Sequence, residues 1–128
     1  MRIHSYAIIV VACLCANVTS AKWENVSQLW PKDMPQSTKE WFSKQKNSTG
    51  SFCCSVADGI PTDWDLKDGH YRVLDTVSLA HPVWRDVPDG AMIRNETNPT
   101  GTAVVWYMPS KDSEGLRGIR CFIAGSEN

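Results

Sequence analysis

The sequence predicts an α+β fold that is mainly β, with two short N-terminal helices followed by a small curled antiparallel sheet of about five strands. Apolar residues recur at helical spacing up to residue 48, whereas short apolar or alternating runs separated by turn-forming residues follow from residue 50. At 128 residues the chain has room for one domain. We therefore expect a helical lead-in over residues 22–48 and a β domain over residues 50–128.

The first predicted helix covers residues 22–30. Trp23, Val26, Leu29 and Trp30 follow one another at intervals of three, three and one residues, which places their side chains on one face of a helix. Pro31 ends the pattern, since proline cannot continue a helix.

The second predicted helix follows Pro35. Ser37 and Glu40 have the spacing of a capping box, in which the two side chains satisfy free amides at the start of a helix. Trp41 and Phe42 would then lie on its inner face, and the polar run 47–50 would end it.

Strands are predicted wherever the two-residue period appears, and turns where glycine, proline and aspartate gather. The expected strands cover residues 51–56, 70–74, 83–87, 91–94, 102–108 and 118–123, with a turn at 58–61. Asn98-Pro-Thr-Gly101 has the composition of a tight turn, which predicts pairing of 91–94 with 102–107. The continuous apolar character of residues 102–107 makes them our candidate for the central strand.

Residues 1–21 have the pattern of a cleavable secretory signal peptide. Arg2 and His4 give a positive start, and the uncharged apolar run 6–16 is shorter than the roughly 20 residues needed to span a bilayer. Thr19-Ser-Ala21 supplies the small residues of a cleavage site. We expect a single exported domain over residues 22–128, in the periplasm or outside the cell, with no transmembrane span in the mature chain.

A lipid anchor is the alternative form of export. Val10-Val-Ala-Cys13 resembles the processing site of a lipoprotein, and acylation of Cys13 would hold the protein at a membrane. Cleavage there would cut the apolar run in half, so processing after Ala21 is the favoured interpretation.

The charge pattern argues against a nucleic acid partner. The formal net charge is -1, with acidic and basic residues interspersed, so no basic patch could neutralise a row of phosphates. The expected partner is an unidentified envelope or extracellular component.

Removal of the signal would turn five cysteines into three, namely Cys53, Cys54 and Cys121. Neighbouring cysteines on a strand point to opposite faces, which disfavours a bridge between Cys53 and Cys54. A bridge from one of them to Cys121 would join distant parts of the β domain in an oxidising compartment. The spacing leaves open which of the two forms it, and whether the remaining sulfur has a function.

Several short motifs together resemble a group of small secreted bacterial proteins of unknown function. They are Trp41-Phe-Ser43, Gly50-Ser-Phe-Cys-Cys-Ser-Val-Ala-Asp58, Val87-Pro88, Asn98-Pro-Thr-Gly-Thr-Ala-Val-Val-Trp106 and Arg120-Cys-Phe122. The resemblance covers most of the mature chain and implies a secreted fold without implying an activity. In that group a cysteine often follows the aspartate, where this chain has Gly59, and this difference would account for the odd cysteine count.

Asp63, Asp65 and Asp68 are weak candidates for a metal site, because several carboxylates on a turn-rich stretch suit a hard cation such as calcium. The calcium-loop pattern is incomplete, however, since Leu74 stands where a closing glutamate belongs. Aspartate is also common in turns for backbone reasons alone. We therefore expect neither a metal site nor a cofactor, and the sequence contains no catalytic motif.

Three hypotheses about function follow. The first is a binding or interaction module without enzymatic activity, in which exposed tryptophans such as Trp23, Trp64 and Trp84 contact a partner, because six tryptophans are many for so small a core. The second is a thiol-dependent redox protein or enzyme that uses the vicinal cysteines. The third is a structural envelope protein.

Overall fold

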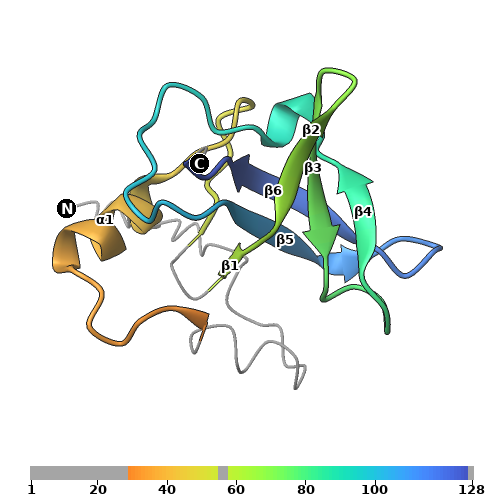
Figure 1. Ribbon diagram of the computed structural model, residues 1–128, viewed down its shortest axis with the longest axis horizontal. Helices are drawn as coiled ribbons and strands as arrows, with labels where there is room; N and C mark the ends of the chain where they lie inside the picture. Colours follow the sequence, from red (N-terminus) through yellow and green to blue (C-terminus); the bar gives the residue numbers. More distant parts are fainter. Residues whose placement is uncertain (1–28, 55–57, 127–128) are drawn as a thin grey trace, which may run out of the picture.

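The computed structural model describes residues 29–54 and 58–126, and strands dominate this part of the chain (Figure 1). The strands form two antiparallel sheets of three, in the orders β1–β5–β6 and β2–β3–β4. The elements in chain order are α1 (Gln36–Lys44), β1 (Gly59–Pro61), β2 (Trp64–Lys67), β3 (His70–Asp75), β4 (Val83–Asp86), the 3-10 turn η2 (Asp89–Ala91), β5 (Val104–Lys111) and β6 (Arg117–Ile123).

The predicted fold of two helices and one sheet of about five strands is wrong. The described residues form one α-helix and two separate sheets. Most of the helix expected over residues 22–30 lies outside the described residues, and Leu29 and Trp30 at its end are not α-helical. The strands divide into two sheets because the middle of the chain makes its own meander, β2–β3–β4, which packs on the other sheet instead of extending it.

The β5 strand is central in its sheet, as its apolar sequence predicted. It pairs with β1 along one edge and with β6 along the other. Alternate side chains of β5 are buried on opposite faces: Val105 and Tyr107 contact the β2–β3–β4 side, whereas Val104 and Trp106 contact the α1 side. A strand buried on both faces has a continuous apolar sequence rather than an alternating one.

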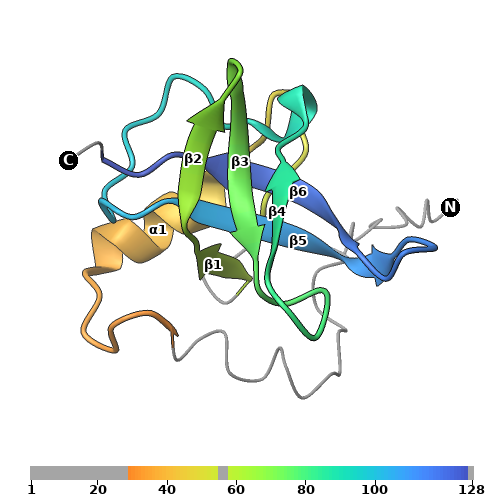
Figure 2. The ribbon, with the colours of Figure 1, turned by 45° about the vertical axis from the view of Figure 1, so that its right-hand side comes forward.

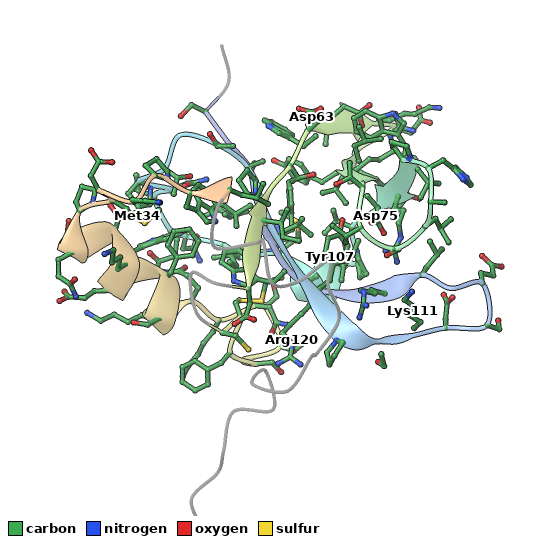
Figure 3. All side chains as sticks on the ribbon, turned by 90° about the horizontal axis from the view of Figure 1, so that it is seen from below. Met34, Asp63, Asp75, Tyr107, Lys111 and Arg120 are labelled. Atoms are coloured by element: carbon green, nitrogen blue, oxygen red, sulfur yellow. A yellow bond between two sulfur atoms is a disulfide. The ribbon has the colours of Figure 1, made fainter. Side chains whose placement is uncertain are left out.

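The molecule therefore has three layers, with sheet β1–β5–β6 in the middle. Helix α1 lies on one side of it and β2–β3–β4 on the other (Figure 1). The strands of β2–β3–β4 run across those of the middle sheet (Figure 2). Figure 3 shows the same order from below, with Met34 on the helix side, Asp75 on the far side and Tyr107 between them.

Helix α1 packs through its aromatic residues but begins differently from the prediction. Phe42 is fully buried and makes edge contacts with Trp30 and Trp41. The helix starts after Pro35 without a side-chain cap, so the expected capping box between Ser37 and Glu40 is absent from this part of the chain. Burial of Phe42, rather than capping, holds the helix in place.

Residues 91–94 do not pair with β5, contrary to the prediction. Both edges of β5 are already occupied, by β1 and by β6. The segment instead lies along the outer edge of β6, where Met92 forms a parallel bridge with Phe122 and the Ile93 amide donates to the Phe122 carbonyl.

The structure contains two short strands that the sequence pattern does not predict, and two predicted strands, 51–56 and 91–94, are not formed in the described residues. Residues 59–61 fall in the predicted turn at 58–61, and residues 64–67 lie in the turn-rich stretch of aspartates, for which no strand is predicted. The turn Asp68-Gly69 that joins β2 to β3 has positive φ at both residues, as a two-residue hairpin requires. The strand expected over 51–56 is reduced, in its described part, to one bridge between Phe52 and Lys46.

Gly59 is the more crowded of the two glycines in the strands of the middle sheet. A Cβ at this residue would lie 3.0 Å from side-chain atoms of Trp106 and Val104 and 3.1 Å from Phe42. The Gly59 carbonyl also accepts a buried hydrogen bond of 2.7 Å from the indole nitrogen of Trp30. Any larger side chain at Gly59 would therefore require Trp106, Val104 or Phe42 to move by a few tenths of an ångström.

We predict that Gly59→Ala lowers the free energy of unfolding by about 1–3 kcal/mol, the usual effect of overpacking a rigid core. Gly118→Ala is the matched control, because its Cβ would approach only Met108, a flexible side chain, at 3.1 Å from the sulfur. Denaturant unfolding of both variants measures the difference. Equal losses would contradict the packing described for Gly59.

Candidate functional site

The structure pairs Cys53 with Cys121 in a disulfide whose Cα atoms are 5.7 Å apart. This assigns the partner that the sequence left open. Both residues are buried, with exposed fractions of 1% and 0%. Because disulfides persist in oxidising compartments, the bond fits the predicted export of the domain. The proposed signal peptide over 1–21 and the alternative anchor Cys13 lie outside the described residues.

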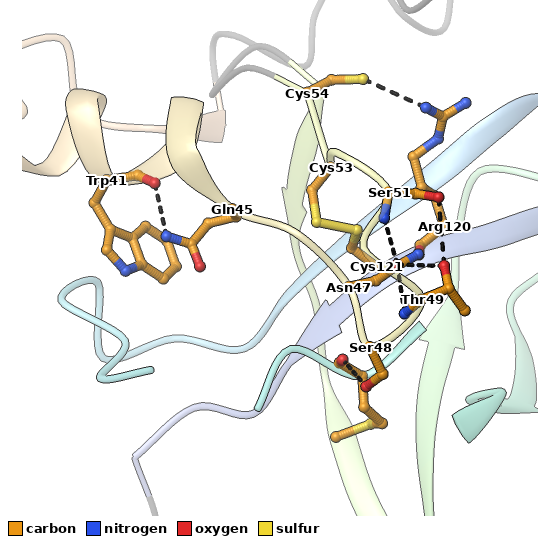
Figure 4. The surroundings of a disulfide bond; sticks show 11 residues. Trp41, Gln45, Asn47, Ser48, Thr49, Ser51, Cys53, Cys54, Arg120 and Cys121 are labelled. Atoms are coloured by element: carbon orange, nitrogen blue, oxygen red, sulfur yellow. Dashed lines mark hydrogen bonds between the residues drawn. A yellow bond between two sulfur atoms is a disulfide. The ribbon is translucent and has the colours of Figure 1, made fainter. Parts of the chain in front are cut away.

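The loop between α1 and Cys53 sets the position of this disulfide (Figure 4). Asn47 Oδ1 accepts hydrogen bonds from the amides of Thr49 and Ser51, and Asn47 Nδ2 donates to the Arg120 carbonyl at 2.8 Å. One asparagine thus folds the loop and attaches it to β6 beside Cys121. The amide of Cys53 donates to the Gln45 carbonyl, which brings its sulfur to β6.

Cys54 points away from this bond. Its φ of 82° lies in the left-handed region, and its sulfur is 3.7 Å from Nη1 of Arg120 (Figure 4). The two vicinal cysteines therefore have different surroundings, one in the core and one half-buried beside a guanidinium. Because Cys53 is bonded to Cys121, the redox hypothesis loses the vicinal dithiol on which it was based.

The three tryptophans predicted to bind a partner differ in how far the structure describes and exposes them. Trp23 lies outside the described residues. Trp64 is half-buried and packs on Tyr71, with ring centroids 5.7 Å apart, so it belongs to the edge of the core. Trp84 keeps 42% of its surface exposed and is the most exposed tryptophan of the described chain.

Trp84 lies on the solvent-facing side of β2–β3–β4. On β3, Tyr71 and Val73 pack into the core shared with the middle sheet, so Arg72 between them points outward. Its guanidinium carbon lies 5.0 Å from the centroid of the Trp84 ring. We call the group formed by Asp65, Arg72, Trp84 and Asp86 the Trp84 face.

The register of the three strands brings the residues of the Trp84 face next to one another. Arg72 is directly opposite Asp65 on β2 and Asp86 on β4. Its Nε donates to Asp65 Oδ1 at 2.8 Å, and a second nitrogen donates to the other carboxylate oxygen. This hydrogen bonding lowers the pKa of Asp65 and raises that of Arg72, so both side chains stay charged.

The buried side of the same sheet carries a polar group that joins the two sheets. The carboxylate of Asp75 accepts from the amides of Val77 and Ser78, each at 3.0 Å, and from Arg85 Nη1 at 2.8 Å. Arg85 also donates to the carbonyl of Arg117 on β6 at 2.7 Å. We call Asp75, Ser78, Arg85 and Arg117 the Asp75 cluster, and its role is to fix the outer sheet on the middle one.

The three aspartates considered for a metal site do not converge. Asp65 is bonded to Arg72, Asp68 occupies the hairpin turn, and Asp63 precedes β2. Within residues 29–54 and 58–126 no three histidine, cysteine or carboxylate side chains are placed to hold a metal ion.

Comparison with known proteins gives one distant similarity. The chain is 23% identical over 113 residues to the immunoglobulin heavy constant epsilon protein of Mus musculus. The match covers 88% of this chain and 26% of the mouse protein, so the chain spans about a quarter of that relative's length. No protein-family model matches the chain, and no solved structure matches it.

The mouse relative is a β protein, and a similarity this distant supports no more specific class for the chain. In immunoglobulin domains a conserved disulfide links strands of two facing sheets. Here Cys53 lies in a loop after α1 and Cys121 in β6, so the bond joins a loop to the middle sheet. What the structure and the similarity share is a small, disulfide-bonded β domain. None of the helices within the described ranges is long and apolar enough to cross a membrane.

We predict that non-reducing peptide mapping recovers a linked pair containing Cys53 and Cys121. Replacing both residues by alanine should lower the free energy of unfolding by about 4 kcal/mol, since the loop they close spans 68 residues. Recovery of Cys54 linked to Cys121 would contradict this assignment.

We also predict that Asp75 makes stability depend on acid pH. Burial raises its pKa, but hydrogen bonds from Ser78, Val77 and Arg85 outweigh this effect and hold the pKa below the ordinary value. The ionised form thus favours the folded state above about pH 4, and this contribution is lost as the pH falls through the folded pKa.

Asp75→Asn should remove that part of the acid dependence and lower stability at neutral pH by about 3 kcal/mol, because Arg85 loses its buried partner. Asp68→Asn, in the exposed turn, is the control and should leave the profile unchanged. Denaturant unfolding between about pH 2 and 7 measures both. The same acid profile in Asp75→Asn and the parent would refute the role given to Asp75.

Proposed function

We propose that the chain is an exported interaction module that binds a protein partner through the Trp84 face. The observation that carries this proposal is an exposed tryptophan held in one orientation on a rigid sheet. The proposal places the domain outside the cytoplasm, as in the group of small secreted bacterial proteins that its motifs resemble. The distant similarity to an immunoglobulin constant region supports a β domain of this general kind.

The composition of the Trp84 face supports a protein as the partner. Tryptophan and arginine dominate the energetically important positions of protein interfaces. The Trp84 ring presents apolar area, and Arg72 beneath it is fixed by Asp65 before any partner arrives. Because these side chains are already ordered, less conformational entropy is lost on binding.

The charges of the Trp84 face define the partner further. Asp65 and Asp86 contribute two carboxylates and Arg72 one guanidinium, and Lys67 on the same strand face as Asp65 supplies the balancing positive charge. The carboxylate of Asp65 is already bonded, whereas Asp86 is exposed at the side of the ring. We therefore expect a partner with an apolar pocket for Trp84 and a lysine or arginine beside it.

Site-specific photo-crosslinking in the cells that produce the chain tests this proposal. A photoreactive amino acid in place of Lys67, which lies on the same strand face as Asp65, should give a discrete adduct. Adding Trp84→Ala should abolish the adduct, because truncating a central interface tryptophan weakens binding by about 30-fold or more. The folded state should be unaffected, since Trp84 is exposed.

The control places the same photoreactive residue at Lys39, an exposed position on α1 in the opposite layer. Any adduct formed there should be independent of Trp84. An adduct at position 67 that persists in the Trp84→Ala protein, or no adduct at position 67, would refute the proposal.

A further inference from the structure

The three methionines of the described chain differ in their access to solvent. Met34 and Met92 are buried, with exposed fractions of 9% and 7%, and each belongs to one of the two cores. Met108, on β5, keeps 38% of its surface exposed. Because an oxidant must reach a thioether sulfur before it can react, Met108 is the one of these three that a dissolved oxidant reaches in the folded state.

The side chain of Met108 lies over Gly118 on the neighbouring strand β6. A Cβ at Gly118 would be 3.1 Å from the sulfur of Met108 and 3.5 Å from its Cγ. Since glycine has no such atom, residue 118 contributes no side chain that could cover the thioether. The contact thus holds the Met108 side chain against the backbone of β6 and leaves its outer side open.

Met108 also lines a hollow of about 520 Å³ beside β6. The apolar part of its lining comes from Pro88, Ala91 and Ile119, and the polar part includes Thr49 and Ser51, which are exposed. This volume is many times the roughly 30 Å³ that one water molecule occupies in the liquid. Hydrogen peroxide, which has one oxygen atom more than water, therefore has room to approach Met108, and an oxygen bonded to the sulfur has room to stay.

From these observations we propose that Met108 is a reversible oxidation site of the folded domain, converted to the sulfoxide by hydrogen peroxide. A lone pair of the sulfur attacks one peroxide oxygen, the O–O bond breaks, and the other oxygen leaves as water. The sulfur gives up two electrons in this step. The product is a polar, chiral side chain in place of an apolar one, so oxidation makes the wall of the hollow polar.

Reversal requires a methionine sulfoxide reductase and a dithiol. The dithiol supplies two electrons and two protons, becomes a disulfide, and the sulfoxide oxygen leaves as water. The exposure that admits the oxidant also admits the reductase. The proposed export of the domain would place Met108 outside the reducing cytoplasm, but its reactivity depends neither on that export nor on the Trp84 face.

Timed treatment of the folded chain with hydrogen peroxide, followed by peptide mass mapping, tests the inference. Cleavage after lysine and arginine puts the three methionines into separate peptides, 33–39, 86–94 and 95–111. Met108 should gain one oxygen at a rate within about threefold of its rate in the chain unfolded by urea. Met34 and Met92 should react at least about tenfold more slowly than in urea, because they become accessible only when the structure opens.

Met108→Leu, a substitution of similar volume, should remove the fast reaction, and Met92→Leu is the matched control that should retain it. Oxidation of Met108 should change the thermal midpoint by less than about 4 °C, because changes at exposed positions have small effects on stability. Methionine sulfoxide reductases of both stereospecificities, with dithiothreitol as the dithiol, should then remove the oxygen from the folded chain.

Three results would overturn the inference. The first is oxidation of Met34 or Met92 in the folded chain as fast as that of Met108. The second is protection of Met108 to the same extent as the two buried methionines, which would mean that the hollow does not admit the oxidant. The third is a sulfoxide at Met108 that both reductases leave in place, which would make the oxidation irreversible in the folded domain.

Discussion

The rest of the structure depends on burial of the middle sheet on both faces. Trp106 and Tyr107, adjacent on β5, enter different cores, one against α1 and the other against β2–β3–β4. Since backbone groups of such a strand are far from water, they must pair within the sheet, and β1 and β6 supply those partners on either side. The Cys53–Cys121 bond then attaches the helix side of the chain to this sheet.

This arrangement divides the outer sheet into two surfaces with different roles. Its inner surface is fixed to β6 through Asp75 and Arg85, so the sheet is held rigidly although its outer surface is open to solvent. On that outer surface, the contact between Arg72 and Trp84 restricts both side chains, whereas exposed side chains are usually mobile.

The sequence predicted those features that depend on a local residue pattern. It did not predict the features that depend on which distant segments pair with one another. The apolar run 102–107 identified the central strand, because only a strand buried on both faces lacks polar alternation. The strands at residues 59–61 and 64–67 were not predicted, because each is too short to show a two-residue hydrophobic period. Both also contain or adjoin turn-forming residues, whose local preference is overridden by pairing with distant strands. Trp84 was a candidate from composition alone, but its partnership with Arg72 depends on strand register, which no local pattern encodes.

Hydrogen–deuterium exchange of backbone amides tests the central claim most directly. If the middle sheet is buried on both faces, amides of residues 103–107 and 119–123 should exchange slowest, at rates set by global unfolding. Amides of β2 and β4, at the edges of the outer sheet, should exchange markedly faster through local opening. Equal or greater protection in β2 and β4 than in β5 would contradict the three-layer account.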